Sequence, residues 1–141
     1  MPPDASSEPE IVFFVDRCLG RLKVVEALTA AGYKAIPHDK LFKQNARDHE
    51  WLPKVAKLGC VILSFDEHLK TNALERLAIK NSKAGVFVLV SKNLVGEEMA
   101  AAFVKAAPAM KRFAAKHKRQ PFVAKVYGTG AVAPWKWDQH L

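Results

Sequence analysis

The chain has 141 residues, of which 50% are hydrophobic, and this is enough for one hydrophobic core in a single domain. No apolar run approaches the ~18 to 20 residues that a membrane-spanning helix needs. Residues 1–10 are polar and acidic, unlike a secretory signal peptide, and we expect them to form a disordered tail. These features exclude a membrane protein and predict a cytoplasmic one. Cys18 and Cys60 lack a CxxC pattern, so neither a disulfide framework nor a zinc site is indicated.

The net charge of +8 is unevenly distributed along the chain. Between Lys105 and Lys125 there are seven basic side chains and no acidic one. Such a surface attracts polyanions and neutralises phosphates, which favours nucleic acid as a partner. For a charge run taken alone, a solvated helix face is the alternative interpretation. The residues that we expect to bind nucleic acid are Lys105, Lys111, Arg112, Lys116, Lys118 and Arg119.

The first half of the chain begins with a continuous apolar run at 11–15, which predicts a buried strand that ends at Asp16. Helical spacing then continues to Gly32, and a short strand follows at 34–37. The next ten residues have no periodicity and are expected to form a loop. Asp48 is predicted to be the N-cap of a helix that stops at Gly59.

The second half begins with another buried strand, at 60–65, which is closed by Asp66. A helix is predicted over 69–81, with Leu74, Leu77 and Ala78 pointing inward, and a third strong strand over 85–90. The longest helix candidate runs from Glu97 to His117, and Pro108 is expected to kink or divide it. Alternation at 122–127 fits an exposed or edge strand.

Strands that alternate with helices in this order predict a three-layer α/β/α fold with a central, mainly parallel sheet. We expect the folded domain to span 11–127. Residues 128–141 contain Trp135 and Trp137 but no periodicity, and form a C-terminal tail that either folds back or contacts a partner. No internal repeat or second domain is indicated.

Acidic residues follow the ends of the predicted elements. Asp16 and Asp66 each close a strand, whereas Asp48 and Glu50 open a helix. In a parallel sheet these positions converge on one edge, where carboxylates repel one another unless a cation neutralises them. Mg²⁺ or Mn²⁺ fits such oxygen ligands, and Glu67 can join them if the chain turns after Asp66. The alternative for each aspartate is a cap or turn former.

Histidines accompany several of these acidic candidates. His38, His49 and His68 each lie beside one, and a histidine so placed can assist as a general base, although surface histidines are the commoner case. The chain contains neither HExxH nor a glycine-rich phosphate-binding motif, so a zinc protease or nucleotide-binding loop is not indicated.

Five segments, in order, resemble the compact PIN-like domains related to toxin ribonucleases: FFVDRCLG, HDKLF, DHEWLPKVAKLG, CVILSFDEHLK and GVFVLV. The resemblance covers roughly residues 11–90 and implies a nuclease fold that cleaves RNA with Mg²⁺ or Mn²⁺. Asp16, Asp48 and Asp66 match the acidic residues that hold the ion in that family. Ser64 stands where the family usually has threonine, and Ser91 and Asn93 lie where many PIN nucleases carry a fourth acid.

Three functions follow from these observations. The first is a metal-dependent endoribonuclease whose catalytic residues are Asp16, Asp48 and Asp66. The resemblance implies that such an enzyme is often the toxin of a toxin–antitoxin pair, with an antitoxin protein as partner, and that such toxins commonly form homodimers. The second is a non-catalytic, nucleic-acid-binding PIN-like module. The third is a structural protein that docks a partner through Trp135 and Trp137.

Overall fold

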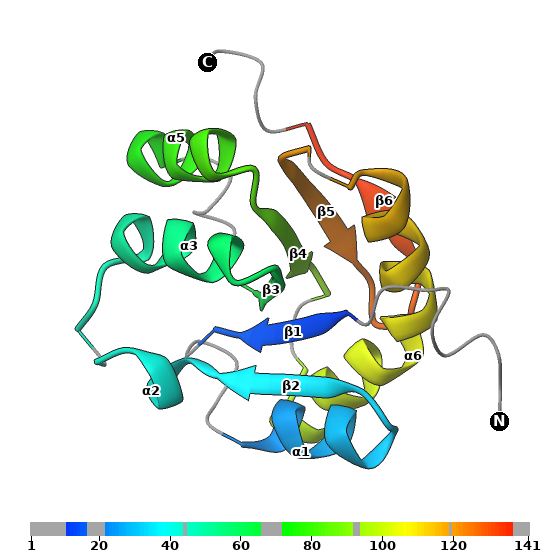
Figure 1. Ribbon diagram of the computed structural model, residues 1–141. Helices are drawn as coiled ribbons and strands as arrows, with labels where there is room; N and C mark the ends of the chain where they lie inside the picture. The colour runs from blue at the N-terminus through cyan, green and yellow to red at the C-terminus, as the bar shows by residue number, and fades with distance from the viewer. Residues whose placement is uncertain are drawn as a thin grey trace, which may run out of the picture.

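The computed structural model describes residues 11–16, 22–43, 45–65, 72–91, 94–118 and 120–136. These residues form a layered α/β structure (Figure 1). The expectations for the N-terminal tail, Asp66, Glu67 and Arg119 lie outside the described residues.

A six-stranded sheet in the order β2-β1-β3-β4-β5-β6 forms the centre of the fold. The strands are β1 (Val12–Val15), β2 (Lys34–Pro37), β3 (Cys60–Ser64), β4 (Gly85–Leu89), β5 (Phe122–Val126) and β6 (Val132–Pro134). All neighbouring strands are parallel except β5 and β6, which pair antiparallel. The predicted, mainly parallel sheet is therefore confirmed.

Helices cover both faces of this sheet. They are α1 (Lys23–Ala30), α2 (His38–Leu41), α3 (Asp48–Lys57), α5 (Ala73–Ser82) and α6 (Gly96–Lys116). Helices α1 and α6 pack on one face and α3 and α5 on the other, which confirms the three-layer arrangement (Figure 1). No helix in the described part of the chain is long and apolar enough to cross a membrane.

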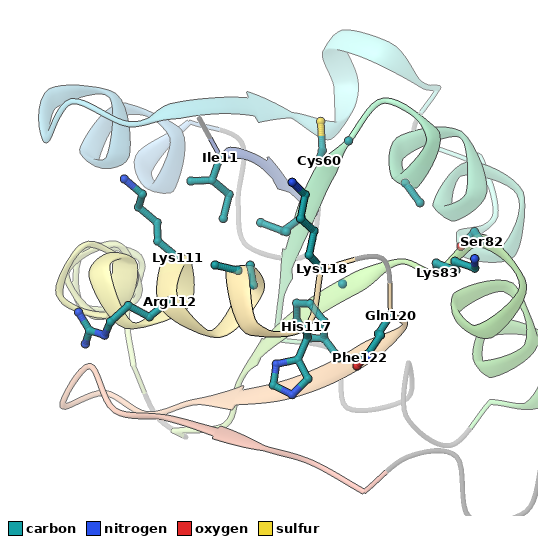
Figure 2. A pocket seen from close by; sticks show the side chains of 16 residues that line it. Ile11, Cys60, Ser82, Lys83, Lys111, Arg112, His117, Lys118, Gln120 and Phe122 are labelled. Carbon is teal, nitrogen blue, oxygen red and sulfur yellow. The ribbon is translucent and has the colours of Figure 1, made fainter. Parts of the chain in front are cut away.

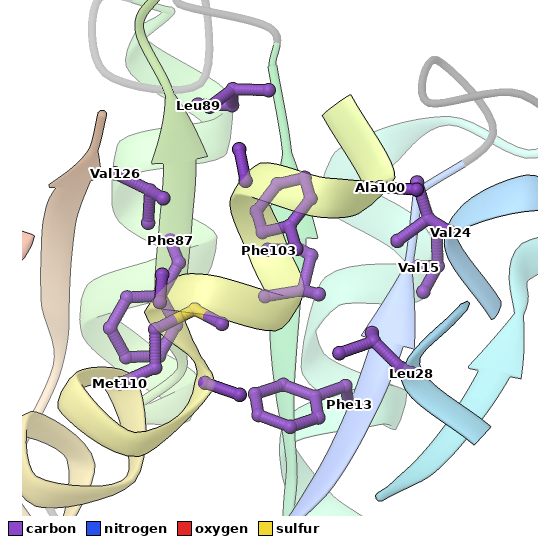
Figure 3. Close-up of a cluster of buried hydrophobic side chains, with 14 of the residues drawn as sticks. Phe13, Val15, Val24, Leu28, Phe87, Leu89, Ala100, Phe103, Met110 and Val126 are labelled. Atoms are coloured by element: carbon purple, nitrogen blue, oxygen red, sulfur yellow. The ribbon is translucent and has the colours of Figure 1, made fainter. Parts of the chain in front are cut away.

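The four inner strands β1, β3, β4 and β5 are largely buried on both faces, so the core consists of two clusters. Phe13 and Val15 of β1 point into the cluster beneath α1 and α6, which also contains Phe103 (Figure 3). Phe14 points to the opposite face and packs with Trp51 of α3. Because side chains alternate along a strand, the residue after Val15 lies on the same face as Phe14. That residue is Asp16.

Two helices differ at least in part from the sequence-based expectation. Helix α6 is not divided at Pro108, because a proline removes a single backbone donor while Ala107 and Met110 remain buried on either side of it; the alternative, a kink at Pro108, stays a prediction. In α5 the buried residue is Ile79, whereas Leu74 and Leu77 are 57% and 45% exposed. The prediction that these two leucines point inward is wrong.

The segment between β2 and α3 was expected to be a loop, but it contains the short helix α2. Asp48 is the first residue of α3, and Arg47 is the N-cap, so Asp48 is not the capping residue. Strand β5 is not at the edge, because residues 132–134 form β6 beside it. Gly32 and Gly59 do terminate their helices, with φ of +94° and +83°.

Candidate active site

Asp16 lies at the carboxyl end of β1, inside the sheet between β2 and β3. Its side chain is buried, with 3% of the residue exposed. The backbone N–H of Asp16 donates to the carbonyl oxygen of Leu63 at 2.9 Å, which continues the parallel pairing by one residue. The Oγ–H of Ser64 donates to Asp16 Oδ2 at 3.0 Å. The strand ends of β1 and β3 are thus joined through both backbone and side chains.

The register of the sheet brings a third side chain to the same level. Val15 pairs with Pro37 on one side and with Leu63 on the other. The residues that follow these three are Asp16, His38 and Ser64. His38 and Ser64 are 2% and 0% exposed, so the carboxyl edge of the sheet is well covered at this point.

Helix α3 connects Asp48 to this edge. The indole Nε1–H of Trp51 donates to Asp48 Oδ1 at 3.0 Å. The Trp51 ring also packs 5.1 Å from the ring of Phe14, two residues before Asp16. Because a helix begins with unpaired N–H groups and positive partial charge, the start of α3 favours carboxylates here. Glu50 is exposed on the first turn of the same helix.

Four rings form an aromatic cluster, which consists of Phe14, His38, Phe42 and Trp51. Every pair of these rings has a centroid distance between 5.1 and 6.2 Å. The cluster fixes the starts of α2 and α3 against β1. Sequence reasoning did not identify it, since His38 was considered mainly as a surface residue. The burial of His38 could have been inferred from parallel pairing of the two strands, because His38 directly follows β2 just as Asp16 directly follows β1.

The structure brings together part of the predicted acidic set. Asp16 contacts Ser64, and Asp48 is linked to β1 through Trp51. Within the described ranges, no three His, Cys, Asp or Glu side chains are grouped as a metal site. Asp66 and Glu67 lie outside those ranges, two and three residues beyond Ser64.

The basic residues of α6 extend away from this edge. Helix α6 runs from the carboxyl end of β4 back to the start of β5, so its last turns lie at the amino ends of the strands. There, Lys111, Arg112 and Lys118 line a pocket together with Ile11 and Cys60, and we call it the amino-end pocket. Ile11 and Asp16 flank β1 at opposite ends, about 17 Å apart at ~3.3 Å per residue. The carboxylates and these cations therefore occupy opposite ends of the sheet.

The fold and the buried acid at the sheet edge define a PIN-like protein. The sequence model of the PIN-like domain matches residues 11–91, more than half of the chain, and the chain belongs to this family. It is 28% identical over 123 residues to "Putative ribonuclease VapC45" of Mycobacterium tuberculosis (strain ATCC 25618 / H37Rv). That match covers 84% of this chain and 88% of the relative. No solved structure matches the chain significantly.

Proposed function

We propose that this protein is a metal-dependent endoribonuclease that acts as the toxin of a toxin–antitoxin pair. The buried carboxylate of Asp16 at the carboxyl edge of the sheet carries this proposal, because buried charges in proteins are paired or coordinate metals. Membership of the PIN-like family and the ribonuclease name of the mycobacterial relative support it. RNA is then the substrate, and an antitoxin protein is the partner.

The donor atoms at this edge suit Mg²⁺ or Mn²⁺, which prefer carboxylate oxygens. Asp16 and Asp48, with Asp66 at the next strand end, would hold the ion, and Glu50 and Glu67 are further candidates. Ser64 donates to Asp16 Oδ2, and because a carboxylate can accept several bonds at once, this hydrogen bond is compatible with a cation on the same group. When bound, such an ion lowers the pKa of a water molecule and stabilises charge on a phosphoryl group.

The other side chains at the edge orient these carboxylates. Ser64 fixes the rotation of the Asp16 carboxylate, and Trp51 does the same for Asp48. The burial of the aromatic cluster keeps the start of α3 against β1, so the two carboxylates keep their relative positions. The basic residues of α6 would contact the RNA backbone rather than the cleaved bond, because they lie toward the opposite end of the sheet.

The test is a cleavage assay on single-stranded RNA with Mn²⁺ or Mg²⁺, compared with the same reaction in EDTA. We expect cleavage by the natural chain and none with EDTA. Asp16→Asn should reduce cleavage to background while the fold is kept, because asparagine has the same shape and can still accept from Ser64 through its carbonyl oxygen. Circular dichroism and thermal melting establish whether that variant is folded.

A matched control is Glu26→Gln, which removes one exposed carboxylate from α1 on the other face of the sheet. This variant should cleave like the natural chain. Cleavage that persists in folded Asp16→Asn, or that is insensitive to EDTA, would contradict the proposed site.

A second function is favoured by one contact after β4. In many PIN nucleases a fourth acid lies in this region, but here the Oγ of Ser91 accepts a hydrogen bond from the N–H of Gly128 at 2.6 Å. Ser91 thus holds the turn before β6. A serine with a structural contact thus stands in the region where many PIN nucleases carry an acid, and this favours a module that binds nucleic acid without cleaving it. RNA binding without cleavage in Mn²⁺ would support that function.

The third function, docking through the tail, rests on fewer residues than the sequence suggested. The N–H of Trp135 donates to the carbonyl oxygen of Val123 at 3.0 Å, and Lys125 Nζ lies 5.6 Å from the centroid of the Trp135 ring. Trp135 is also partly buried against the core. Its ring is therefore used within the chain, and docking would depend on Trp137 and its neighbours.

A further inference from the structure

The amino-end pocket has a volume of about 580 Å³ and lies at the end of the sheet opposite to Asp16. It is bordered by residues at or beside the starts of four strands: Ile11, Cys60, Gly85 and Phe122. Gly85 leaves room for the Phe122 ring, because a Cβ at this position would lie 2.4 Å from Phe122 Cζ. The pocket therefore has a defined apolar floor made by Ile11, Val61 and Phe122.

The rim of the pocket is basic. No aspartate or glutamate among the described residues lines it. Its cationic groups are Lys83, Lys111, Arg112 and Lys118, and its other titratable groups are His117 and Cys60. Figure 2 shows the side chain of Lys118 ending beside Ile11 and Cys60, whereas Lys111 extends on the other side of Ile11 and Arg112 points away. Both lysines line the pocket, and because their side chains are long and flexible, each can reach an anionic group above the apolar floor.

Lys83 gives a second indication at the α5 side of the pocket. It has φ of +58° and is the only non-glycine residue with positive φ in the described part of the chain. A lysine in this left-handed conformation costs about 1–2 kcal/mol, and glycine would remove that cost. Strained residues of this kind cluster at functional sites.

Helices α3, α5 and α6 all end near the pocket, so the negative partial charge of three helix ends is directed to this region. Such an environment opposes a bare anion. It suits a ligand that carries hydrogen-bond donors as well as negative charge. A nucleotide meets both requirements, because its base is flat, largely apolar and bears N–H groups, while its phosphate is anionic. The volume lies within the ~300–1,000 Å³ of small-molecule sites.

We propose that the amino-end pocket binds one nucleotide, with its base on the apolar floor and its phosphate on Lys111 and Lys118. The nucleotide belongs to a single-stranded RNA that extends beyond the carboxylate edge, or it is a free mononucleotide. Only the RNA source rests on the proposed ribonuclease function. The competing explanation is that these lysines merely complement the negative ends of the helices.

The experiment measures binding, not cleavage, and uses folded Asp16→Asn protein in EDTA so that the RNA stays intact. Titrations compare 5′-AMP, adenosine and a short single-stranded RNA. Lys111→Ala and Lys118→Ala are each introduced, and Lys57→Ala is the matched control. Lys57 is exposed at the end of α3 near the pocket and carries the same charge, but it does not line the pocket and is not among the residues expected to bind nucleic acid.

We expect 5′-AMP to bind about tenfold more tightly than adenosine, because a charge-assisted hydrogen bond to phosphate is lost in the nucleoside. Lys111→Ala and Lys118→Ala should each weaken the binding of 5′-AMP about tenfold, whereas Lys57→Ala should change it less than about twofold. RNA that binds more tightly than 5′-AMP identifies the substrate strand as the source, and 5′-AMP binding without RNA binding identifies a free nucleotide. The proposal is wrong if all three variants lose affinity for 5′-AMP equally, or if adenosine binds as tightly as 5′-AMP.

Cys60 supplies an independent measurement, because it lines the pocket. Burial raises the pKa of the Cys60 thiol, so labelling with a small thiol reagent should be slow at neutral pH and measurable under alkaline conditions. In a Cys18→Ser background, 5′-AMP should slow this labelling at concentrations about tenfold lower than those at which adenosine does. Unchanged labelling at saturating 5′-AMP would place the nucleotide elsewhere and contradict the assignment. None of these measurements requires nuclease activity. A failure of the nucleotide-binding proposal can therefore be distinguished from a failure of the proposed ribonuclease function.

Discussion

Ser64 and Asp16 form a buried polar pair at the centre of the carboxyl edge. A donor to a carboxylate favours its charged form, and in a buried site this hydrogen bond also fixes which lone pairs remain for another ligand. Ser64 is therefore a positioning residue in the proposed ribonuclease. Its hydroxyl corresponds in position to the threonine that PIN-like proteins usually carry there.

Replacing Ser64 tests this role. Ser64→Ala should raise the Mn²⁺ concentration needed for half-maximal cleavage about tenfold, since residues that orient metal ligands have effects of ~10–100-fold. It should also lower the free energy of unfolding by about 1–3 kcal/mol, because the buried Asp16 oxygen loses a donor. Cleavage is measured over a Mn²⁺ titration, and stability by denaturant unfolding.

Ser64→Thr keeps the hydroxyl and should retain the metal dependence of the natural chain. Ser82→Ala is the matched control, because it also removes one hydroxyl. The Ser82 hydroxyl donates to the carbonyl oxygen of Ala78 within α5 and not to Asp16. This substitution should leave the Mn²⁺ titration unchanged. If Ser64→Ala cleaves with the same Mn²⁺ dependence as the natural chain, Ser64 has no positioning role.

Asp16 could be anticipated from sequence, whereas the aromatic cluster around Phe14 was missed. A continuous apolar run that stops at one aspartate predicts a strand end, and the residues 11–15 are unambiguous. His38 and Trp51 come together with Phe14 only through the parallel register and the start of α3. A short helix follows β2 directly, so no local periodicity indicated that His38 is buried.

The predictions for helices and strands failed where an element that is distant in sequence packs beside them and determines which residues are buried. Alternation in β5 indicated an edge strand, but the three-residue β6 shields it, and such a short strand has no periodicity of its own. In α5, the apolar pattern did not show which face packs, and Ile79 rather than Leu74 is buried. The strands β1, β3 and β4 were predicted well because they are buried on both faces.

The C-terminus of α5 allows a test of stored strain. Lys83→Gly should raise the free energy of unfolding by about 1 kcal/mol, because glycine adopts φ of +58° without the penalty that a Cβ imposes. The same variant removes a cation from the amino-end pocket, so nucleotide binding should weaken while stability rises. Denaturant unfolding and 5′-AMP titration measure the two effects.

Lys80→Gly is the appropriate control, since Lys80 is exposed within the same helix and has ordinary helical backbone. This substitution should lower stability by about 1 kcal/mol. A decrease in stability for Lys83→Gly as well would mean that the left-handed residue is not strained.

The whole molecule has two chemically different ends. Asp16, Asp48 and the helix starts lie at the carboxyl ends of the strands, and Lys111, Lys118 and the helix ends lie at the amino ends. This polarity follows from parallel strands joined by helices, because each helix must return in the opposite direction. The residue types at each end oppose the partial charges of the helices there.

The segment after Gly130 contributes to the stability of the whole fold. Truncation after Gly130 removes β6 and Trp135, and should lower the free energy of unfolding by at least about 2 kcal/mol, because a sheet edge is uncovered and aromatic surface is exposed. Truncation after Lys136 leaves β6 in place and should melt like the natural chain. Equal melting temperatures for the two truncated chains would show that β6 is dispensable.

The two outermost strands share one further property. β2 ends in Pro37 and β6 in Pro134, and both strands are short. Proline cannot donate a main-chain hydrogen bond. Neither edge strand therefore presents an unbroken row of backbone groups with which a strand from another molecule could pair. Copies of this chain would therefore assemble through the outer surfaces of their helices and not by joining their sheets into one. The same feature protects a folded chain against ordered aggregation at high concentration.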